Sequence, residues 1–324
     1  MIIRKYKKGD EVGILKLDRL VEEHVWNRRN LRNWFWKFNK KKRSMKSIVY
    51  VCEKNNKIIA TFAILPIKWK IYNQELKASH SIAMIVHPDY QNKGLIKFVA
   101  DKVIQKAKSK KFEFVYGYPN QKAYDLHKYF FGYEDAFDQN LYFKKLKKEI
   151  NKKNFKGFNL IETKFFSKSH DKLWQDIKNE YPIILKRSSE FLNWRYAERP
   201  DHRYYIFTLY YNKKNIGYMV SKIYKEKKIL RGHIIDIFVS QKDLRYFRYL
   251  IDSANNFFIK KKCHEITMWL NGSKKLQKSL ILKDFKIKSY RKMICKFDLN
   301  NKDYKNILNP KSWYFTMGDT FEIY

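Results

Sequence analysis

The sequence predicts a mixed α/β fold made of two units of similar size. The first observation is the length of 324 residues, which leaves room for about two domains that can each bury a core. The second is the alternation of β-forming runs with amphipathic helical patterns, which is typical of a sheet flanked by helices. The third is a set of landmarks that recurs in the same order in both halves, which indicates a duplicated unit.

The period of the apolar residues predicts the elements of the first half. In chain order these are strand 2–6, helix 10–21, helix 26–38, strands 48–52, 58–65 and 67–72, central strand 81–86, a long helix after Gly94, strand 112–118, helix 121–131 and strand 141–145. Asp10 is placed to cap the first helix. Residues 53–57 read Glu-Lys-Asn-Asn-Lys, and because Asn tolerates positive φ this turn predicts a hairpin.

The chain is organised around a strand, a turn and a helix that follow one another from residue 81 to residue 107. Residues 81–86 form a continuous apolar run typical of a buried strand, and Pro88 ends it. After Gly94 the apolar residues recur with helical spacing. The turn therefore lies at a helix N-terminus, where unpaired N–H groups and the helix dipole favour a phosphate group.

Residues 144–157 are polar and rich in lysine, and we expect them to link a first domain at 1–148 to a second at 158–324. The landmarks of the first domain recur in the second: Trp36-Lys37-Phe38 as Trp194-Arg195-Tyr196, the turn 53–57 as 211–215, and the strand 80–86 as 233–239. After Val239 the second copy has bulky residues and no glycine where Gly94 would fall. We therefore expect one phosphate site, in the first half.

Residues 86–94, Val-His-Pro-Asp-Tyr-Gln-Asn-Lys-Gly, resemble the V-x-P-x-(Y/W)-(Q/R)-x-x-G segment of GNAT-superfamily N-acyltransferases. The resemblance implies two tandem GNAT-like domains, each a mixed, mostly antiparallel sheet flanked by helices. It also implies an acyl-coenzyme A co-substrate whose pyrophosphate lies on this loop. Ile96 departs from the family pattern, which has a small residue there. By resemblance, the residues expected to bind the coenzyme are Ile85, Val86, Gln91, Asn92, Lys93, Gly94, Leu95, Ile96 and Asn120.

The segment that begins at Asn120 resembles the N-x-x-A-x-x-x-Y-x-x-x-G-F segment of the family, whose tyrosine protonates the departing thiolate. Here the stretch to Tyr133 is one residue longer than that pattern and has no tyrosine at the expected place. We expect His127 to donate the proton instead, because its ordinary pKa lies near neutrality, with Tyr129 as a nearby substitute. The alternative for His127 is a surface position on the helix.

His80 and Asp236 are the other catalytic candidates. Acyl transfer to an amine needs a base for the amine and an N–H that polarises the thioester carbonyl, which we expect at the end of the central strand. His80 on that strand is either this base or a core histidine bonded to the backbone. Asp236 is costly to bury alone, so it either pairs with Arg195 or Arg231 or faces a polar ligand.

Composition limits the possible partners and the compartment. The net charge of +38 is spread along the whole chain, which argues against nucleic acid as the partner. The three cysteines Cys52, Cys263 and Cys295 lie far apart without metal-ligand spacing, so we expect a reducing compartment and no metal. The chain opens directly into a charged turn, and no apolar run is long enough to span a bilayer. We expect a cytoplasmic protein.

Residues 189–196 and 313–319 loosely resemble segments of two-domain GNAT proteins from bacterial surface-polysaccharide gene sets. Some of these proteins N-acylate an amino sugar carried on a nucleotide diphosphate. The region that contacts the acceptor in the family here holds Trp26, Arg32, Trp34 and Trp36. An aromatic stripe at helical spacing is more often core. The resemblance implies an acyl-coenzyme A-dependent N-acyltransferase acting on a small amine, with a nucleotide-linked amino sugar as the acceptor.

Two other functions stay open. A Fem-type aminoacyl-tRNA-dependent peptidoglycan transferase suits the basic charge, but it does not need the loop from Gln91 to Gly94. A non-catalytic binding protein that keeps the GNAT fold is consistent with Ile96 and with the missing tyrosine. The sequence also leaves open whether the chain forms a homodimer.

Overall fold

A computed structural model describes residues 1–21, 30–38, 45–147, 149, 155–297 and 307–321. The first half begins with β1 (Ile2–Lys5), α1 (Asp10–Val21), α2 (Leu31–Phe38), β2 (Ile48–Lys54), β3 (Lys57–Ile71) and β4 (Gln74–Val86). It continues with a short 3₁₀ turn (Pro88–Tyr90), α3 (Leu95–Ser109), β5 (Phe114–Gly117), α4 (Gln121–Asp125), a π-helical turn (Leu126–Phe130) and β6 (Glu134–Lys145). The strand, turn and helix predicted around Gly94 are confirmed.

The second half repeats this order. It contains β7 (Phe158–Thr163), α5 (Lys168–Ile177), β8 (Ile183–Leu185), α6 (Ser189–Leu192), β9 (Tyr205–Tyr211), β10 (Lys214–Glu226), β11 (Ile229–Val239), α7 (Leu244–Lys260), β12 (Glu265–Trp269), α8 (Lys274–Ile281), β13 (Lys286–Phe297) and β14 (Trp313–Tyr314). The series β9-β10-β11-α7-β12 thus matches β2-β3-β4-α3-β5. No described helix is both long enough and apolar enough to cross a membrane.

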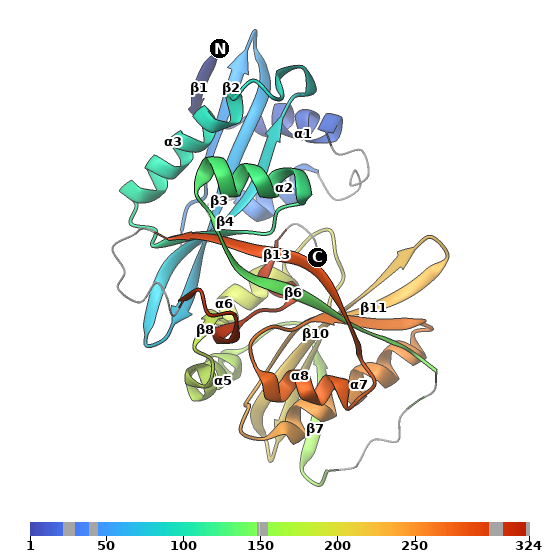
Figure 1. Ribbon diagram of the computed structural model, residues 1–324. Helices are drawn as coiled ribbons and strands as arrows, with labels where there is room; N and C mark the ends of the chain where they lie inside the picture. The colour runs from blue at the N-terminus through green and yellow to red at the C-terminus, as the bar shows by residue number, and fades with distance from the viewer. Residues whose placement is uncertain (22–29, 39–44, 148, 150–154, 298–306, 322–324) are drawn as a thin grey trace.

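One sheet runs through both halves in the order β1-β2-β3-β4-β5-β13-β6-β12-β11-β10-β9-β7 (Figure 1). The last strands of the two halves exchange places: β6 pairs with β12 and β13 of the second half, and β13 pairs with β5 of the first. In Figure 1, β6 and β13 cross the middle of the molecule side by side. The fold is therefore mixed α/β with a large, mostly antiparallel sheet, as the sequence predicts.

Both predicted hairpin turns are present, and each places two residues at positive φ. Asn55 and Asn56 have φ of 49° and 58°, and Asn212 and Lys213 have φ of 47° and 66°. Positive φ at both central residues is characteristic of a type I′ turn, whose twist matches that of the flanking strands. The Asn-Asn pair explains why the first of these turns was readable from the sequence.

Successive side chains of β2 point to opposite faces of the sheet and so pack into two different cores. Val49 and Val51 pack with α1 and the main core, whereas Ile48 and Cys52 pack with α3. On the α3 side, Val99 is completely buried. The sheet of the first half is therefore covered on both faces, and this fixes where α3 begins relative to the end of β4.

The predicted break between strands 58–65 and 67–72 is wrong, because β3 continues through Pro66. Pairing with β2 ends at Ile64, and pairing with β8 begins only at Trp69. Pro66 thus lies where one side of β3 has no neighbouring strand, which is the position in a sheet where a missing N–H is tolerated. The continuous strand joins the first half to β8 of the second.

The tryptophans that the repeat places at equivalent positions contact each other. The rings of Trp36 and Trp194 stack with centroids 5.0 Å apart and an interplanar angle of 13°. Each indole N–H donates to the backbone carbonyl of the other residue, at 2.7 Å from Trp36 and 3.1 Å from Trp194. Such reciprocal contacts are those of a two-fold interface. Trp34 and Trp36 are buried and Arg32 is exposed, while Trp26 lies outside the described residues.

Candidate active site

A cleft opens where β4 and β5 separate. The two strands pair only from Ala78 to His80 on β4, opposite Phe114 to Tyr116 on β5. Beyond this point β4 bulges, and Ala83 has a φ of 52°. Bulges of this kind re-aim the backbone and are frequent beside active sites. The cleft is lined by His80, Ser81, Ile82, Ala83, Met84, Ile85, Gly117, Tyr118, Pro119, Asn120, Ala123, His127 and Thr320.

The start of α3 lies beyond the end of β4 and is open to solvent. Gly94 precedes the helix with φ 71° and ψ 0°, and a Cβ placed on it would meet no atom within 4 Å. Gln91, Asn92 and Lys93 are also exposed. The first N–H groups of a helix have no partner within it, so an anion can reach them here.

Two side chains of the loop form hydrogen bonds with nearby backbone carbonyls. The Gln91 amide donates to the Val86 carbonyl at 3.0 Å, which ties the loop to the end of β4. The Lys93 ammonium donates to the Asp89 carbonyl at 2.8 Å. Asn92 has a φ of 58°. These two hydrogen bonds hold the loop in a turn.

Leu95 and Ile96 are the first residues of α3, and both side chains are buried in the core beneath it. The bulky residue at 96, which departs from the family pattern, therefore does not cover the loop. Ile85 and Val86 remain paired with β3 opposite Thr61 and Ala60. Of the two, Ile85 also lines the cleft.

Asn120 lies on the opposite wall of the cleft, at the start of α4. Its side-chain oxygen accepts from the Ala123 N–H at 2.9 Å, which caps the helix. The structure therefore brings Asn120, Ile85, His80 and His127 to one cleft, with the Gln91–Gly94 loop at the far end of β4.

His127 is buried in the cleft wall, which is not the surface position left open above. The π-helical turn at Leu126–Phe130 accommodates the additional residue that separates this segment from the family pattern, because a π turn holds one residue more than an α turn. His127 Nδ1 lies 2.7 Å from the Ala123 carbonyl, and Nε2 lies 3.3 Å from Ser81 Oγ. Burial lowers the pKa of His127, so its ring is neutral at pH 7.

The other candidate acids and bases are placed differently. His80 is buried and stacks on Tyr116 with ring centroids 4.8 Å apart. Tyr129 is 75% exposed and is not among the residues that line the cleft. The structure thus brings His80 and His127 together and leaves Tyr129 outside.

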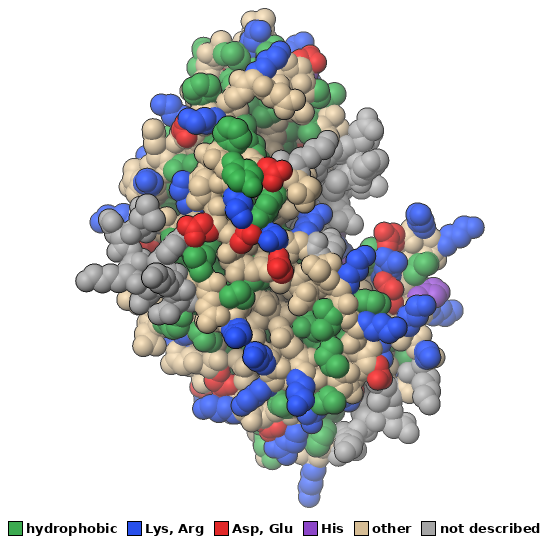
Figure 2. Space-filling model, in the orientation of Figure 1, with side chains coloured by type: hydrophobic (Ala, Val, Ile, Leu, Met, Phe, Trp, Pro, Cys, Tyr) green, Lys and Arg blue, Asp and Glu red, His purple; other side chains and the backbone are tan. Residues whose placement is uncertain are grey.

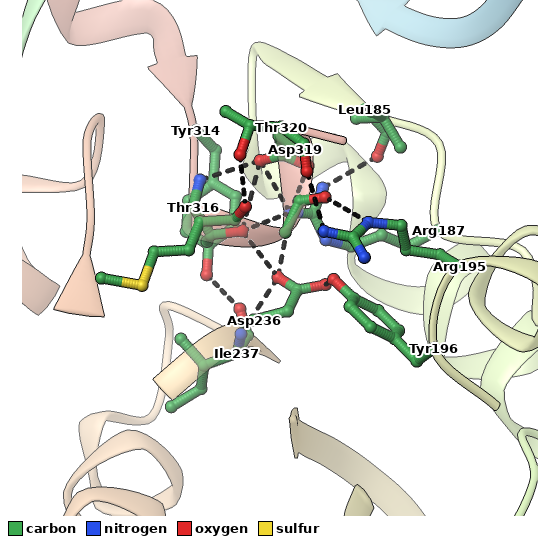
Figure 3. A network of polar contacts seen from close by, with 12 residues as sticks. Leu185, Arg187, Arg195, Tyr196, Asp236, Ile237, Tyr314, Thr316, Asp319 and Thr320 are labelled. Carbon is green, nitrogen blue, oxygen red and sulfur yellow. Dashed lines mark hydrogen bonds and ion pairs between the residues drawn. The ribbon is translucent and has the colours of Figure 1, made fainter. Parts of the chain in front are cut away.

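Asp236 belongs to a buried polar network in the second half (Figure 3). It accepts hydrogen bonds from Arg187 at 3.1 Å, Tyr218 at 2.9 Å and Thr316 at 3.0 Å. Arg187 also pairs with Asp319 at 3.1 Å. The predicted ion-pair partners of Asp236, Arg195 and Arg231, are therefore wrong. Its partner is Arg187, which follows β8 and reaches Asp236 on β11 only in the folded chain.

The C-terminal segment fills the position in the second half that corresponds to the cleft. Tyr314 donates from its hydroxyl to the Ile237 carbonyl of β11, and Phe315 forms a backbone bridge with Asn271, just after β12. Tyr181 donates to the Val239 carbonyl on the same side. Residues 313–315 therefore occupy the gap between β11 and β12, which is consistent with a single coenzyme site in the first half.

Among the polar residues that line the cleft, Ser81, Tyr118 and Thr320 were not predicted from the sequence. Ser81 and Tyr118 lie just beyond the residues of the two strands that pair, so the predicted strands could have indicated them. Thr320 comes from the far end of the chain, and Arg195 holds it there by donating to its carbonyl at 2.8 Å. The described residues include no cluster of three or more His, Cys, Asp or Glu that could hold a metal ion.

Comparison with known proteins agrees with this geometry. Residues 2–136 match the family model described as the acetyltransferase (GNAT) domain, and no curated protein sequence matches the chain. A conserved protein from Enterococcus faecalis V583, named a probable N-acyltransferase, superposes with a TM-score of 0.68 at 13% identity, over 91% of this chain and 72% of its own. A GCN5-related N-acetyltransferase from Anabaena variabilis ATCC 29413 gives 0.67 at 15%, over 91% and 73%.

At these identities the solved structures show the fold alone. The chain has a GNAT-like fold, and the match to the GNAT domain covers the half that holds the open loop and the cleft. The resemblance seen in the sequence is thereby confirmed for the domain and the fold. The amino-sugar subtype stays a prediction.

Proposed function

We propose that this chain is an acyl-coenzyme A-dependent N-acyltransferase whose coenzyme site is in the first half. The observation that carries the proposal is the open start of α3 at Gly94, set at the end of the strand that borders the cleft. The pyrophosphate would lie on the N–H groups after Gly94, and the thioester arm would run along β4 into the cleft. Acyl-coenzyme A is the co-substrate, and the proposed chemistry needs no metal.

The acceptor in this proposal is a small amine, with a nucleotide-linked amino sugar as the specific candidate. Lys and Arg are spread over both halves of the face in Figure 2, in keeping with the net charge of +38, and such a field attracts a diphosphate-bearing molecule. The described residues that line the cleft include no Asp, Glu, Lys or Arg, which suits an uncharged amine in the reacting position. The comparisons favour neither the Fem-type transferase nor a non-catalytic binding protein.

Replacing Gly94 with Trp is expected to weaken binding of acetyl-coenzyme A by at least ~100-fold, because the indole would cover the helix N–H groups and remove charge-assisted hydrogen bonds to the pyrophosphate. Isothermal titration calorimetry with the purified chain measures this directly. The matched control is Gly9→Trp. Gly9 also has positive φ and open space around it, but it lies in the turn between β1 and α1 and does not line the cleft.

The control is expected to bind acetyl-coenzyme A as the unaltered chain does. Equal affinity in the Gly94→Trp variant, or no binding by the unaltered chain, would contradict the coenzyme site. The acceptor is tested separately, by release of the coenzyme thiol when UDP-glucosamine is supplied. Thiol release with simple amines but not with this sugar nucleotide would limit the proposal to the reaction class.

A further inference from the structure

Ser81 occupies the point at which the cleft begins. His80 and Tyr116 form the last pair between β4 and β5, and Ser81 is the next residue on β4. Its side chain lines the cleft and is partly exposed, whereas His127 behind it is 4% exposed. A substrate in the cleft therefore meets the hydroxyl of Ser81 more readily than the imidazole of His127.

The hydrogen bonds of His127 determine which of its ring nitrogens carries the proton. The Ala123 carbonyl can only accept, so Nδ1, at 2.7 Å, must be the protonated nitrogen. Nε2 is then an unprotonated acceptor, and Ser81 Oγ at 3.3 Å is positioned to donate to it. The arrangement is a hydroxyl, a base and a group that orients the base.

Tyr133, the residue just before β6, packs against His127. Its ring contacts that of His127 edge-on, with centroids 4.9 Å apart. Burial raises the pKa of Tyr133, so it keeps its proton at neutral pH. The edge-on ring of Tyr133 packs against the imidazole of His127, and Ser81 is left to donate to Nε2 from the cleft side.

We propose that Ser81 is a catalytic residue that relays the proton of the acyl transfer between the substrates and His127. The inference rests on the proposed function. As the C–N bond forms, the amine gives a proton to Ser81 Oγ, and Ser81 gives its own proton to His127 Nε2. As the C–S bond breaks, the imidazolium returns that proton through Ser81 to the thiolate. The proton lost by nitrogen is the one gained by sulfur, so no further reactant is needed.

The relay makes Ser81 and His127 one unit, which a double-mutant comparison tests. Ser81→Ala and His127→Gln are each expected to lower kcat by about 100-fold, the usual worth of a positioned acid or base. The double variant is expected to lose no more than the worse single variant, because residues that act as a unit are strongly non-additive. The assay is thiol release from acetyl-coenzyme A, with UDP-glucosamine as the amine and with water as the nucleophile when it is omitted.

Ser79→Ala is the matched control. Ser79 is buried two residues earlier on β4, within the part paired with β5, and it is not among the residues that line the cleft. This variant is expected to keep the kcat of the unaltered chain. Calorimetry is expected to show unchanged acetyl-coenzyme A affinity for Ser81→Ala, which separates a lost relay from a lost coenzyme site.

Coenzyme binding with a normal kcat in Ser81→Ala would overturn the relay and leave the proposed function intact. So would losses that multiply in the double variant. Failure of the unaltered chain to bind acetyl-coenzyme A would overturn both.

Discussion

Replacing Arg187 with Met is expected to lower the free energy of unfolding by about 3–5 kcal/mol, the cost typical of removing one partner from a buried ion pair. Arg187 is 1% exposed and lies 3.1 Å from a carboxylate oxygen of Asp236 and 3.1 Å from one of Asp319. Without the guanidinium, two buried carboxylates face each other with no cation between them. The loss therefore comes from stranded charge, since Met packs well in a buried site.

Urea unfolding followed by circular dichroism measures this change. The control is Arg245→Met, because Arg245 also pairs with a carboxylate, that of Asp243 at 2.6 Å, but its side chain is 62% exposed. An exposed pair contributes about 1 kcal/mol or less. Adding Asp319→Asn to Arg187→Met is expected to recover part of the stability. A loss for Arg187→Met no larger than that of the control would contradict the role of the network.

Local signals account for what could be predicted from the sequence. The apolar run of the central strand, the proline turn and the glycine before a helical period lie within thirty residues of one another. Each of these signals depends on the backbone preferences of a few consecutive residues and not on contacts with distant parts of the chain. For that reason β4, the loop and α3 appear where the sequence predicts them. The repeat was also readable, because equivalent tryptophans and hairpin turns keep their order along the chain.

Pairings between distant parts of the chain could not be predicted in this way. The exchange of β6 and β13 depends on which strand edges meet after both halves form, and no sequence period encodes it. Asp236 was correctly expected to need a partner, but Arg187 reaches it through the path of β8. The π-helical turn that buries His127 is likewise set by packing, because a helical period alone does not reveal an added residue.

Asp319→Asn is expected to change how stability depends on pH. Burial raises the pKa of Asp319 from 3.8 to about 6; the Arg187 guanidinium opposes this shift and the neighbouring Asp236 carboxylate adds to it. A carboxyl group whose pKa is raised on folding contributes stability that is complete below its unfolded pKa and is lost as the pH rises through its folded pKa. Since the unfolded carboxyl, with a pKa of 3.8, is already more than half ionised at pH 4, the contribution lost between pH 4 and pH 7 is about 2 kcal/mol.

The destabilisation caused by Asp319→Asn is therefore expected to be larger at pH 4 than at pH 7 by about 2 kcal/mol, measured by urea unfolding at both values. His170, whose pKa burial lowers to about 4, gives the opposite slope but is present in both chains and cancels. Asp243→Asn is the control of opposite sign, because the hydrogen bond from Arg245 lowers the pKa of Asp243. Its effect should be small and should grow as the pH rises. A destabilisation by Asp319→Asn that is the same at both pH values would contradict the raised pKa, because it would mean that folding leaves the pKa of this carboxyl unchanged.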